Sequence, residues 1–277
     1  MKTLRDAVYG VAIGDALGSP VQFKIRDTFP YVKEMLYCDS FHKKAGTWTD
    51  DTSLTLALCD SIRKKKTINT KDILKRFRKW LNWGKYTQDG KPFDIGKTCY
   101  CAIKSGKGLD DFNSNGNGSL MRIIPLAFVE NITDQKIVEV SAITHAHTIA
   151  CEACKIYIHI ARDLINDKSI SEAVKRNSPK SYSIFTSLNS LETRQREEIK
   201  STGYVVDSLE AALWSLLKTN SFRDAVETAV NLGGDADTIG AVTGGLAGII
   251  YGIEGIPKEW MEALRRKKTI EKYLFNL

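Results

Sequence analysis

The stretch NLGGDADTIGAVTGGLAG, residues 231–248, decides what kind of fold this chain adopts. Its second half consists of Gly, Ala, Val, Ile, Leu and Thr, and this glycine-dense composition predicts a buried helix that packs closely against its neighbours. Asp235, Asp237 and Thr238 stand at the mouth of that helix. A carboxylate at a buried helix end is costly unless it is paired or metal-bound, and the stretch contains no Lys or Arg. The stretch therefore predicts a core helix with a cation near its first turn.

A similar acidic turn occurs earlier in the chain. In GTWTDDTS, residues 46–53, we expect Thr49 to cap a helix that has Asp50 and Asp51 in its first turn. One such site needs no ligand, because carboxylates suit the positive end of the helix dipole. The two sites together supply four carboxylates and two threonine hydroxyls, the hard oxygen ligands that Mg²⁺ and Mn²⁺ prefer. Four carboxylates balance two divalent ions, so we expect a two-metal site suited to hydrolysis.

Two other interpretations of GGDADT, residues 233–238, fit less well. The aspartyl-phosphate phosphatases carry D-x-D-x-T after a buried strand, but here Thr238 comes one residue too early and follows a helical pattern. An EF-hand loop needs later ligands and a closing Glu, which residues 239–245 do not supply.

Helical spacing of apolar residues runs through most of the chain, and strand-like alternation is absent. Two segments stay ambiguous: residues 20–46, which we expect to form an irregular loop, and the polar residues 177–205. The pattern predicts an all-α fold with one compact domain over residues 1–277. The expected helices cover residues 52–63, 70–81, 134–146, 151–165, 206–217 and 222–232, with Asn69 or Thr70, Thr133 and Ser221 as N-caps.

Composition is that of a soluble globular protein, with 43% hydrophobic and 26% charged residues. The most apolar stretch, residues 238–253, is shorter than the ~20 residues of a membrane span. Charges at Arg5, Asp6 and Asp15 interrupt any signal core, so we expect a cytoplasmic protein without membrane association. The net charge of +7 is concentrated in basic runs without a nucleic-acid motif, so we expect solvated faces and no nucleic-acid partner.

The six cysteines are expected to be reduced thiols, because an export signal is missing. CEAC at residues 151–154 is a CxxC pair, and His145 and His147 lie just upstream, so a zinc site stays open as an alternative. The segment has a helical pattern and no second CxxC follows, which favours small buried side chains on one helix face.

Seven motifs in order resemble the ADP-ribosylglycohydrolases, a family that includes the dinitrogenase reductase-activating glycohydrolases. Each motif is short, but their shared order over nearly the whole chain makes chance agreement improbable. They are GVAIGDALGSPVQF (10–23), GTWTDDTS (46–53), FDIGKTC (93–99), GNGSLMRIIPLA (116–127), SAITHAH (141–147), YVVDSLEAALWSL (204–216) and NLGGDADTIGAVTGGLAG (231–248).

The resemblance implies an all-α fold with a binuclear Mg²⁺ or Mn²⁺ centre in a central cleft. The substrate it implies is ADP-ribose on a protein side chain, cleaved at the glycosidic carbon. Asp94 and Asp51 match residues implicated in catalysis. The implied metal ligands are Thr49, Asp50, Asp51, Asp235, Asp237 and Thr238, and the implied substrate contacts are Asn117, Gly118, Ser119, His145, Gly233 and Gly234.

Simpler roles stay open for three of these features. Asp94 could cap the helix that begins near residue 95, and His145 could be a core histidine bonded to a backbone carbonyl. Residues 115–119 could be an ordinary turn before a helix.

One position departs from the family pattern. Seven residues after Asp15 the family often has a glutamate, but this chain has Gln22, and an amide cannot act as a general base. The leading hypothesis is a metal-dependent hydrolase that removes ADP-ribose from arginine. A hydrolase of serine O-linked ADP-ribose, a non-catalytic ADP-ribose reader and a structural use of the fold are the alternatives; the intact metal acids argue against the last.

Overall fold

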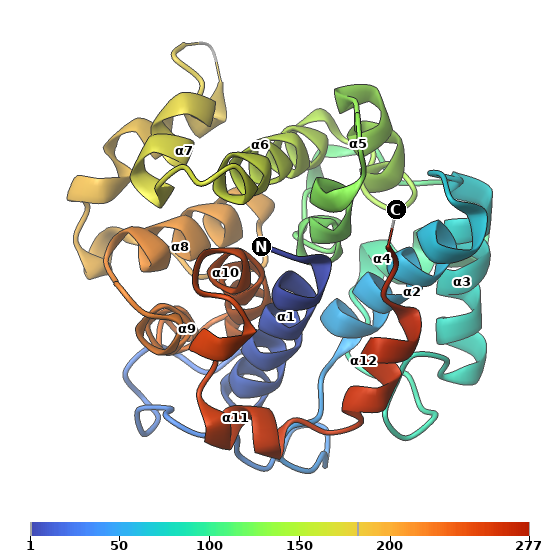
Figure 1. Ribbon diagram of the computed structural model, residues 1–277, viewed down its shortest axis with the longest axis horizontal. Helices are drawn as coiled ribbons and strands as arrows, with labels where there is room; N and C mark the ends of the chain where they lie inside the picture. Colours follow the sequence, from blue (N-terminus) through green and yellow to red (C-terminus); the bar gives the residue numbers. More distant parts are fainter. Residues whose placement is uncertain (1, 182, 277) are drawn as a thin grey trace.

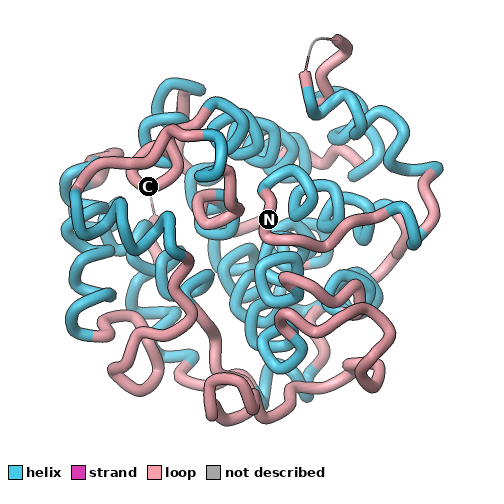
Figure 2. Tube along the Cα trace, turned by 180° about the vertical axis from the view of Figure 1, so that it is seen from behind, coloured by secondary structure: helices cyan, strands magenta, loops and turns pink. Residues whose placement is uncertain are grey.

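The computed structural model describes residues 2–181 and 183–276, and within them helices and loops make up the whole fold (Figures 1 and 2). The all-α prediction is therefore confirmed. No helix in the described part is long and apolar enough to cross a membrane. The helices are α1 Leu4–Gly18, α2 Asp50–Lys65, α3 Thr70–Trp83, α4 Lys97–Ser105, α5 Asp134–Ser141, α6 Thr148–Ile165, α7 Ile170–Asn177, α8 Val205–Leu217, α9 Phe222–Val230, α10 Ala236–Tyr251, α11 Lys258–Ala263 and α12 Lys267–Tyr273.

α1 and α10 lie side by side in the middle of the molecule, with the other helices around them (Figure 1). They run antiparallel, because Gly10 faces Gly244 and Gly14 faces Gly240. A Cβ atom added at Gly240 would lie 2.5 Å from the Gly14 carbonyl oxygen, closer than real Cβ atoms come. Only glycine permits this approach of the two backbones. The buried, closely packed helix predicted from residues 231–248 is confirmed.

Local capping explains where the predicted helices begin. Asn69, Thr133 and Ser221 accept hydrogen bonds from backbone N–H groups at 2.9, 3.3 and 3.0 Å. The helix expected over residues 134–146 ends earlier, at Ser141. It ends there because the chain turns to pair with Leu109, whose N–H donates to the Thr144 carbonyl at 3.0 Å.

In their described residues, the two ambiguous segments consist of loops and short helical turns. Residues 20–46 form an irregular loop, as expected, with an isolated bridge between Cys38 and Lys43. The polar segment 177–205 contains 3₁₀ turns at Ile184–Thr193 and Arg196–Glu198.

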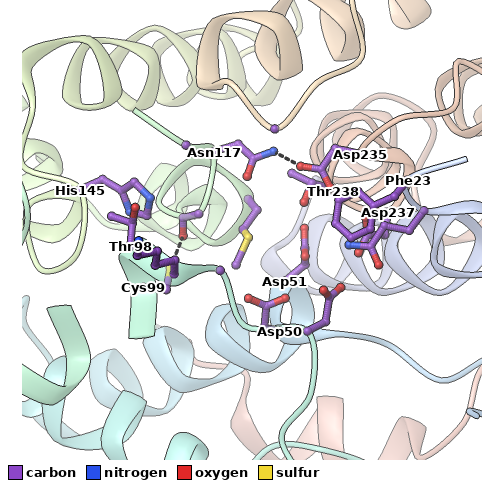
Figure 3. Close-up of a pocket in the computed structure, with 18 residues that line it drawn as sticks. Phe23, Asp50, Asp51, Thr98, Cys99, Asn117, His145, Asp235, Asp237 and Thr238 are labelled. Carbon is purple, nitrogen blue, oxygen red and sulfur yellow. Dashed lines mark hydrogen bonds between the residues drawn. The ribbon is translucent and has the colours of Figure 1, made fainter. Parts of the chain in front are cut away.

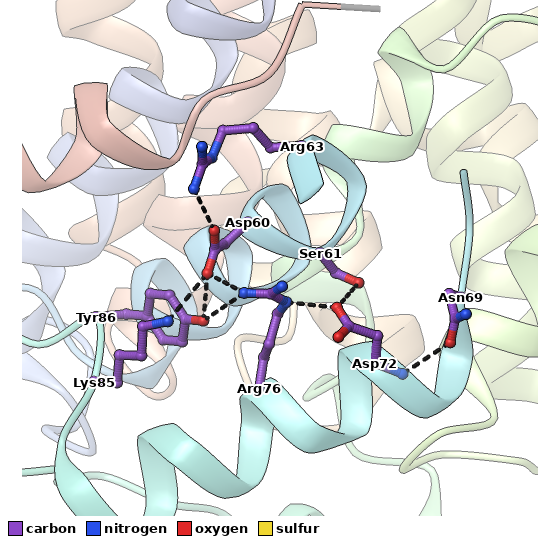
Figure 4. Close-up of polar contacts among 8 residues, drawn as sticks. All are labelled: Asp60, Ser61, Arg63, Asn69, Asp72, Arg76, Lys85 and Tyr86. Atoms are coloured by element: carbon purple, nitrogen blue, oxygen red, sulfur yellow. Dashed lines mark hydrogen bonds and ion pairs between the residues drawn. The ribbon is translucent and has the colours of Figure 1, made fainter. Parts of the chain in front are cut away.

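Part of the basic sequence is paired and does not form a free solvated face (Figure 4). Asp60 of α2 is buried and accepts hydrogen bonds from Arg63 at 2.8 Å, Tyr86 at 2.9 Å and Lys85 at 3.2 Å. Arg76 of α3 also pairs with Asp60, so this carboxylate joins α2 to α3. Burial raises the pKa of Asp60, but these partners outweigh it and the pKa falls below its ordinary value.

The CxxC cysteines pack inside the fold. Cys151 and Cys154 lie on α6 with buried, free thiols, as the helical pattern favoured. Within the described residues no group of three His, Cys, Asp or Glu side chains that could hold an ion includes them.

Candidate active site

Three helix ends converge on one cleft (Figure 3). Because α1 and α10 are antiparallel, Gly18 at the end of α1 packs against Ala236 at the start of α10. The first turns of α10 and α2 thereby bring their acidic residues to the same cleft. Its lining includes Gln22, Phe23, Asp50, Asp51, Asp94, Lys97, Thr98, Cys99, Asn117, Gly118, His145, Asp235, Asp237 and Thr238.

Asp15, a residue outside the predicted site, fixes the position of α2. Its carboxylate accepts hydrogen bonds from the Thr49 N–H at 2.8 Å, the Thr52 N–H at 3.0 Å and the Thr52 hydroxyl at 2.6 Å. Burial raises the pKa of Asp15 to about 7, and these hydrogen bonds oppose the rise. The signal in the sequence was a single carboxylate inside the apolar run GVAIGDAL, residues 10–17, which a buried helix keeps only with partners.

The acidic residues at the two helix ends are buried close together. Asp50, Asp51 and Asp237 are at most 5% exposed, and burial raises the pKa of each well above its ordinary value. The negative charge of neighbouring carboxylates adds to each rise, with Asp94 the largest such contribution for Asp50 and Asp237. The site therefore favours a bound cation or proton over free carboxylates.

Asp94 reaches the cleft from the loop before α4. Its backbone has φ of 57°, a left-handed conformation that is uncommon outside glycine. The N-cap of α4 is Gly96, so the alternative role of Asp94 as a helix cap is wrong. Burial raises the pKa of Asp94, and the neighbouring side chains of Asp237 and Gln22 oppose the rise.

Asn117 holds Asp235 in place. The Asn117 amide donates to the Asp235 carboxylate at 2.6 Å (Figure 3). It also donates to the Ser208 hydroxyl at 2.8 Å. Residues 115–119 are therefore more than an ordinary turn, because they orient an acid at the mouth of α10.

The oxygen atoms at the acidic end of the cleft fit a hard cation. Both carboxylate oxygens of Asp237 and Oδ1 of Asp51 are buried without a hydrogen-bond partner in the described part of the chain. Such atoms are expensive to bury unless a cation or proton accompanies them. No group of three or more His, Cys, Asp or Glu side chains among the described residues is already arranged to hold an ion.

His145 presents a hydrogen-bond donor at the opposite end of the cleft. Arg122, which only donates, gives a hydrogen bond to the Thr144 hydroxyl at 2.9 Å. That hydroxyl lies 2.8 Å from His145 Nδ1 and, while it accepts from Arg122, still has its own proton to donate, which favours the tautomer with the imidazole proton on Nε2. Burial, helped by the charge of Arg122, lowers the pKa of His145 to about 3, so the ring stays neutral. The alternative of a backbone carbonyl as the ring's partner is wrong.

Four residues named from the sequence lie behind the cleft wall. Thr49 caps α2, and its hydroxyl contacts Asp51 Oδ2 at 3.0 Å. Ser119 is fully buried and bonded to the Ser141 hydroxyl at 2.9 Å. Gly233 and Gly234 have φ of 68° and 63° and pack against backbone around residues 24–26 and 201. Their roles toward metal or substrate stay predictions.

The whole chain resembles known glycohydrolases. Residues 2–276 match the family model for ADP-ribosylglycohydrolase. The chain belongs to the ADP-ribosylglycohydrolase family. It is 32% identical to the ADP-ribosylarginine hydrolase Tri1 of Pseudomonas putida, covering 97% of this chain and 76% of that protein. It is 30% identical to the ADP-ribosyl-[dinitrogen reductase] glycohydrolase of Rhodospirillum rubrum, covering 94% and 90%. A solved ADP-ribosylglycohydrolase-related protein complex superposes with a TM-score of 0.82 at 30% identity, covering 97% and 94%.

Proposed function

We propose that this family member hydrolyses the N-glycosidic bond between ADP-ribose and an arginine side chain of a modified protein. The observation that carries the proposal is the meeting of five aspartates from α2, α10 and the loop before α4 at one cleft. Relatives at about this level of identity over nearly the whole chain carry the name of that activity.

The same aspartates are the candidates for holding two Mg²⁺ or Mn²⁺ ions. We assign Asp50, Asp51, Asp235 and Asp237 as carboxylate ligands, with Thr49 and Thr238 supplying hydroxyl oxygens. The unpartnered oxygens of Asp51 and Asp237 support this assignment. When bound, such ions orient ribose hydroxyls and lower the pKa of a water.

The chain's own residues have separate tasks in the reaction. Asp94, whose pKa is raised by burial, would accept the proton of the attacking water. Departure of the guanidine leaves positive charge on the ribose, which the surrounding carboxylates stabilise. Gly118 allows close approach of the ligand, and the Nε2–H of His145 would donate to a phosphate or ribose oxygen.

A test compares release of ADP-ribose from arginine-modified and serine-modified proteins in Mg²⁺ or Mn²⁺. We expect release from arginine that disappears with EDTA and in Asp51→Asn. Faster release from serine would overturn the choice of linkage. A protein that binds ADP-ribose without any turnover would overturn the hydrolase proposal.

A reader function is the second candidate because of Gln22. Its side chain is buried at the cleft, its Oε1 has no hydrogen-bond partner among the described residues, and an amide supplies neither charge nor a general base. Gln22→Glu separates the two readings. If wild type shows no turnover and Gln22→Glu shows measurable turnover, the reader function is supported. If wild type is already active, the reader function is ruled out.

A further inference from the structure

Phe23 is held in a strained conformation at the rim of the cleft. Its backbone has φ of 62°, and its side chain is 70% exposed. Two backbone hydrogen bonds fix it there: the Phe23 N–H donates to the Gly234 carbonyl at 2.6 Å, and the Gly234 N–H donates to the Lys24 carbonyl at 2.9 Å. Gly234 directly precedes Asp235, so the rim is attached to the acidic end of the cleft.

Stability of the fold does not explain this residue. A non-glycine residue with positive φ costs free energy, and an exposed aromatic ring recovers little of it by burial. Ile25, two residues further, is also exposed, at 74%. Of the nine non-glycine residues with positive φ in the described part of the chain, only Phe23 and Asp94 line the cleft, and Phe23 combines this conformation with an exposed aromatic ring.

The position of Phe23 indicates which part of a ligand it meets. Phe23 lies beside Asp235 and Asp237 at the acidic end, whereas His145 and Thr98 lie at the other end (Figure 3). The one lysine or arginine among the lining residues, Lys97, neighbours Thr98. We therefore expect the anionic diphosphate to bind at the His145 end of the cleft. The ring of Phe23, at the acidic end, is then available to contact the protein side chain that is joined to ADP-ribose by the scissile bond.

We propose that Phe23 is a stacking platform for the guanidinium group of the ADP-ribosylated arginine, and that Ile25 contacts the adjoining polypeptide. A guanidinium is planar and cationic, and it stacks on aromatic faces. The inference rests on the proposed function, and it identifies the contact that distinguishes arginine from an uncharged side chain.

The test measures two quantities in the metal-loaded protein: kcat/KM for ADP-ribosylarginine and the Kd of free ADP-ribose. Phe23→Leu keeps an apolar side chain but removes the aromatic face, so we expect kcat/KM to fall about two- to fivefold. The Kd of ADP-ribose, which lacks the guanidinium, should stay unchanged. Phe23→Trp should restore kcat/KM, and the control Tyr37→Leu, at an exposed aromatic outside the cleft lining, should have no effect.

Three outcomes overturn the inference. An equal loss of ADP-ribose affinity in Phe23→Leu would show that the ring stacks on adenine. Unchanged values for both ligands would show that the ring has no role. If the wild-type protein binds ADP-ribosylarginine without turnover, the Kd of ADP-ribosylarginine is measured in place of kcat/KM. A Kd that Phe23→Leu leaves unchanged then contradicts the stacking role of Phe23 independently of catalysis.

Discussion

Gly240→Ala is predicted to separate α1 from α10 and to impair the site at the mouth of α10. The added Cβ would lie 2.5 Å from the Gly14 carbonyl oxygen, whereas ordinary contact begins near 3.4 Å. The two backbones must therefore move apart by about 0.9 Å. Alanine has the higher helix propensity, by about 1 kcal/mol, so any loss of stability must come from this collision.

The size of the effect follows from the distance to the site. Gly240 is three residues from Asp237, so a displacement of its backbone is passed directly to that carboxylate. A misplacement near 1 Å costs roughly a hundredfold in rate, and overpacking costs about 1–3 kcal/mol of stability. We expect kcat/KM to fall about a hundredfold and the melting temperature to fall, measured by ADP-ribose release and thermal unfolding.

Two matched variants on α10 separate displacement from general destabilisation. Ala247→Gly lowers helix propensity by about 1 kcal/mol without adding an atom, so it should lower stability and leave kcat/KM nearly unchanged. Gly248→Ala collides with the Asp6 backbone farther from the cleft, so its effect on stability should exceed its effect on rate. A Gly240→Ala protein that is more stable and fully active would refute the reasoning.

Three further predictions concern ionic and polar groups. Asp60→Asn should cost about 1–3 kcal/mol in urea unfolding, because the buried Asp60 carboxylate is the shared partner of Arg63, Arg76 and Lys85, whereas the exposed Asp134→Asn should cost less than about 1 kcal/mol. Because the pKa of Asp60 is lowered in the folded protein, its contribution to stability is present at neutral pH and is lost as pH falls through the folded-state pKa. An Asp60→Asn protein that unfolds in acid at the same pH as wild type would contradict this. Mg²⁺ or Mn²⁺ should raise the melting temperature more at pH 8 than at pH 5. The reason is that the raised pKa values of Asp51 and Asp237 make the metal-free protein lose stability as pH rises. An equal rise in melting temperature at both pH values would count against metal binding by these two carboxylates. Thr144→Val should weaken ADP-ribose binding about five- to tenfold in calorimetry, because it removes the hydroxyl that keeps the imidazole proton of His145 on Nε2. Thr243→Val, at a buried hydroxyl with no hydrogen-bond partner in the described part of the chain, should leave the binding unchanged.

The helices and their acidic turns could be predicted from local sequence. Capping by Asn69, Thr133 and Ser221 involves residues three positions apart, so the signal is contained in a few letters. The pairing of the motifs at residues 46–53 and 231–248 was accessible because their oxygen-rich composition suits one kind of ligand.

The sequence could not reveal contacts that depend on how distant helices pack. Asp15 binds residues 34 and 37 positions away, and Asn117 binds Asp235 across 118 positions. The early end of the helix at Ser141 has the same origin, since Leu109 competes for the backbone that follows it.

By itself, the sequence determined the all-α fold, the acidic helix ends and the family. Helical spacing and capping act within one turn, and the family motifs are short local patterns. Only the tertiary structure decided that Asp15 anchors α2, that Thr144 sets the tautomer of His145, and that Phe23 stands exposed beside the acids. These features depend on the direction and separation of α1 and α10, which are set by backbone contact between glycines far apart in the chain.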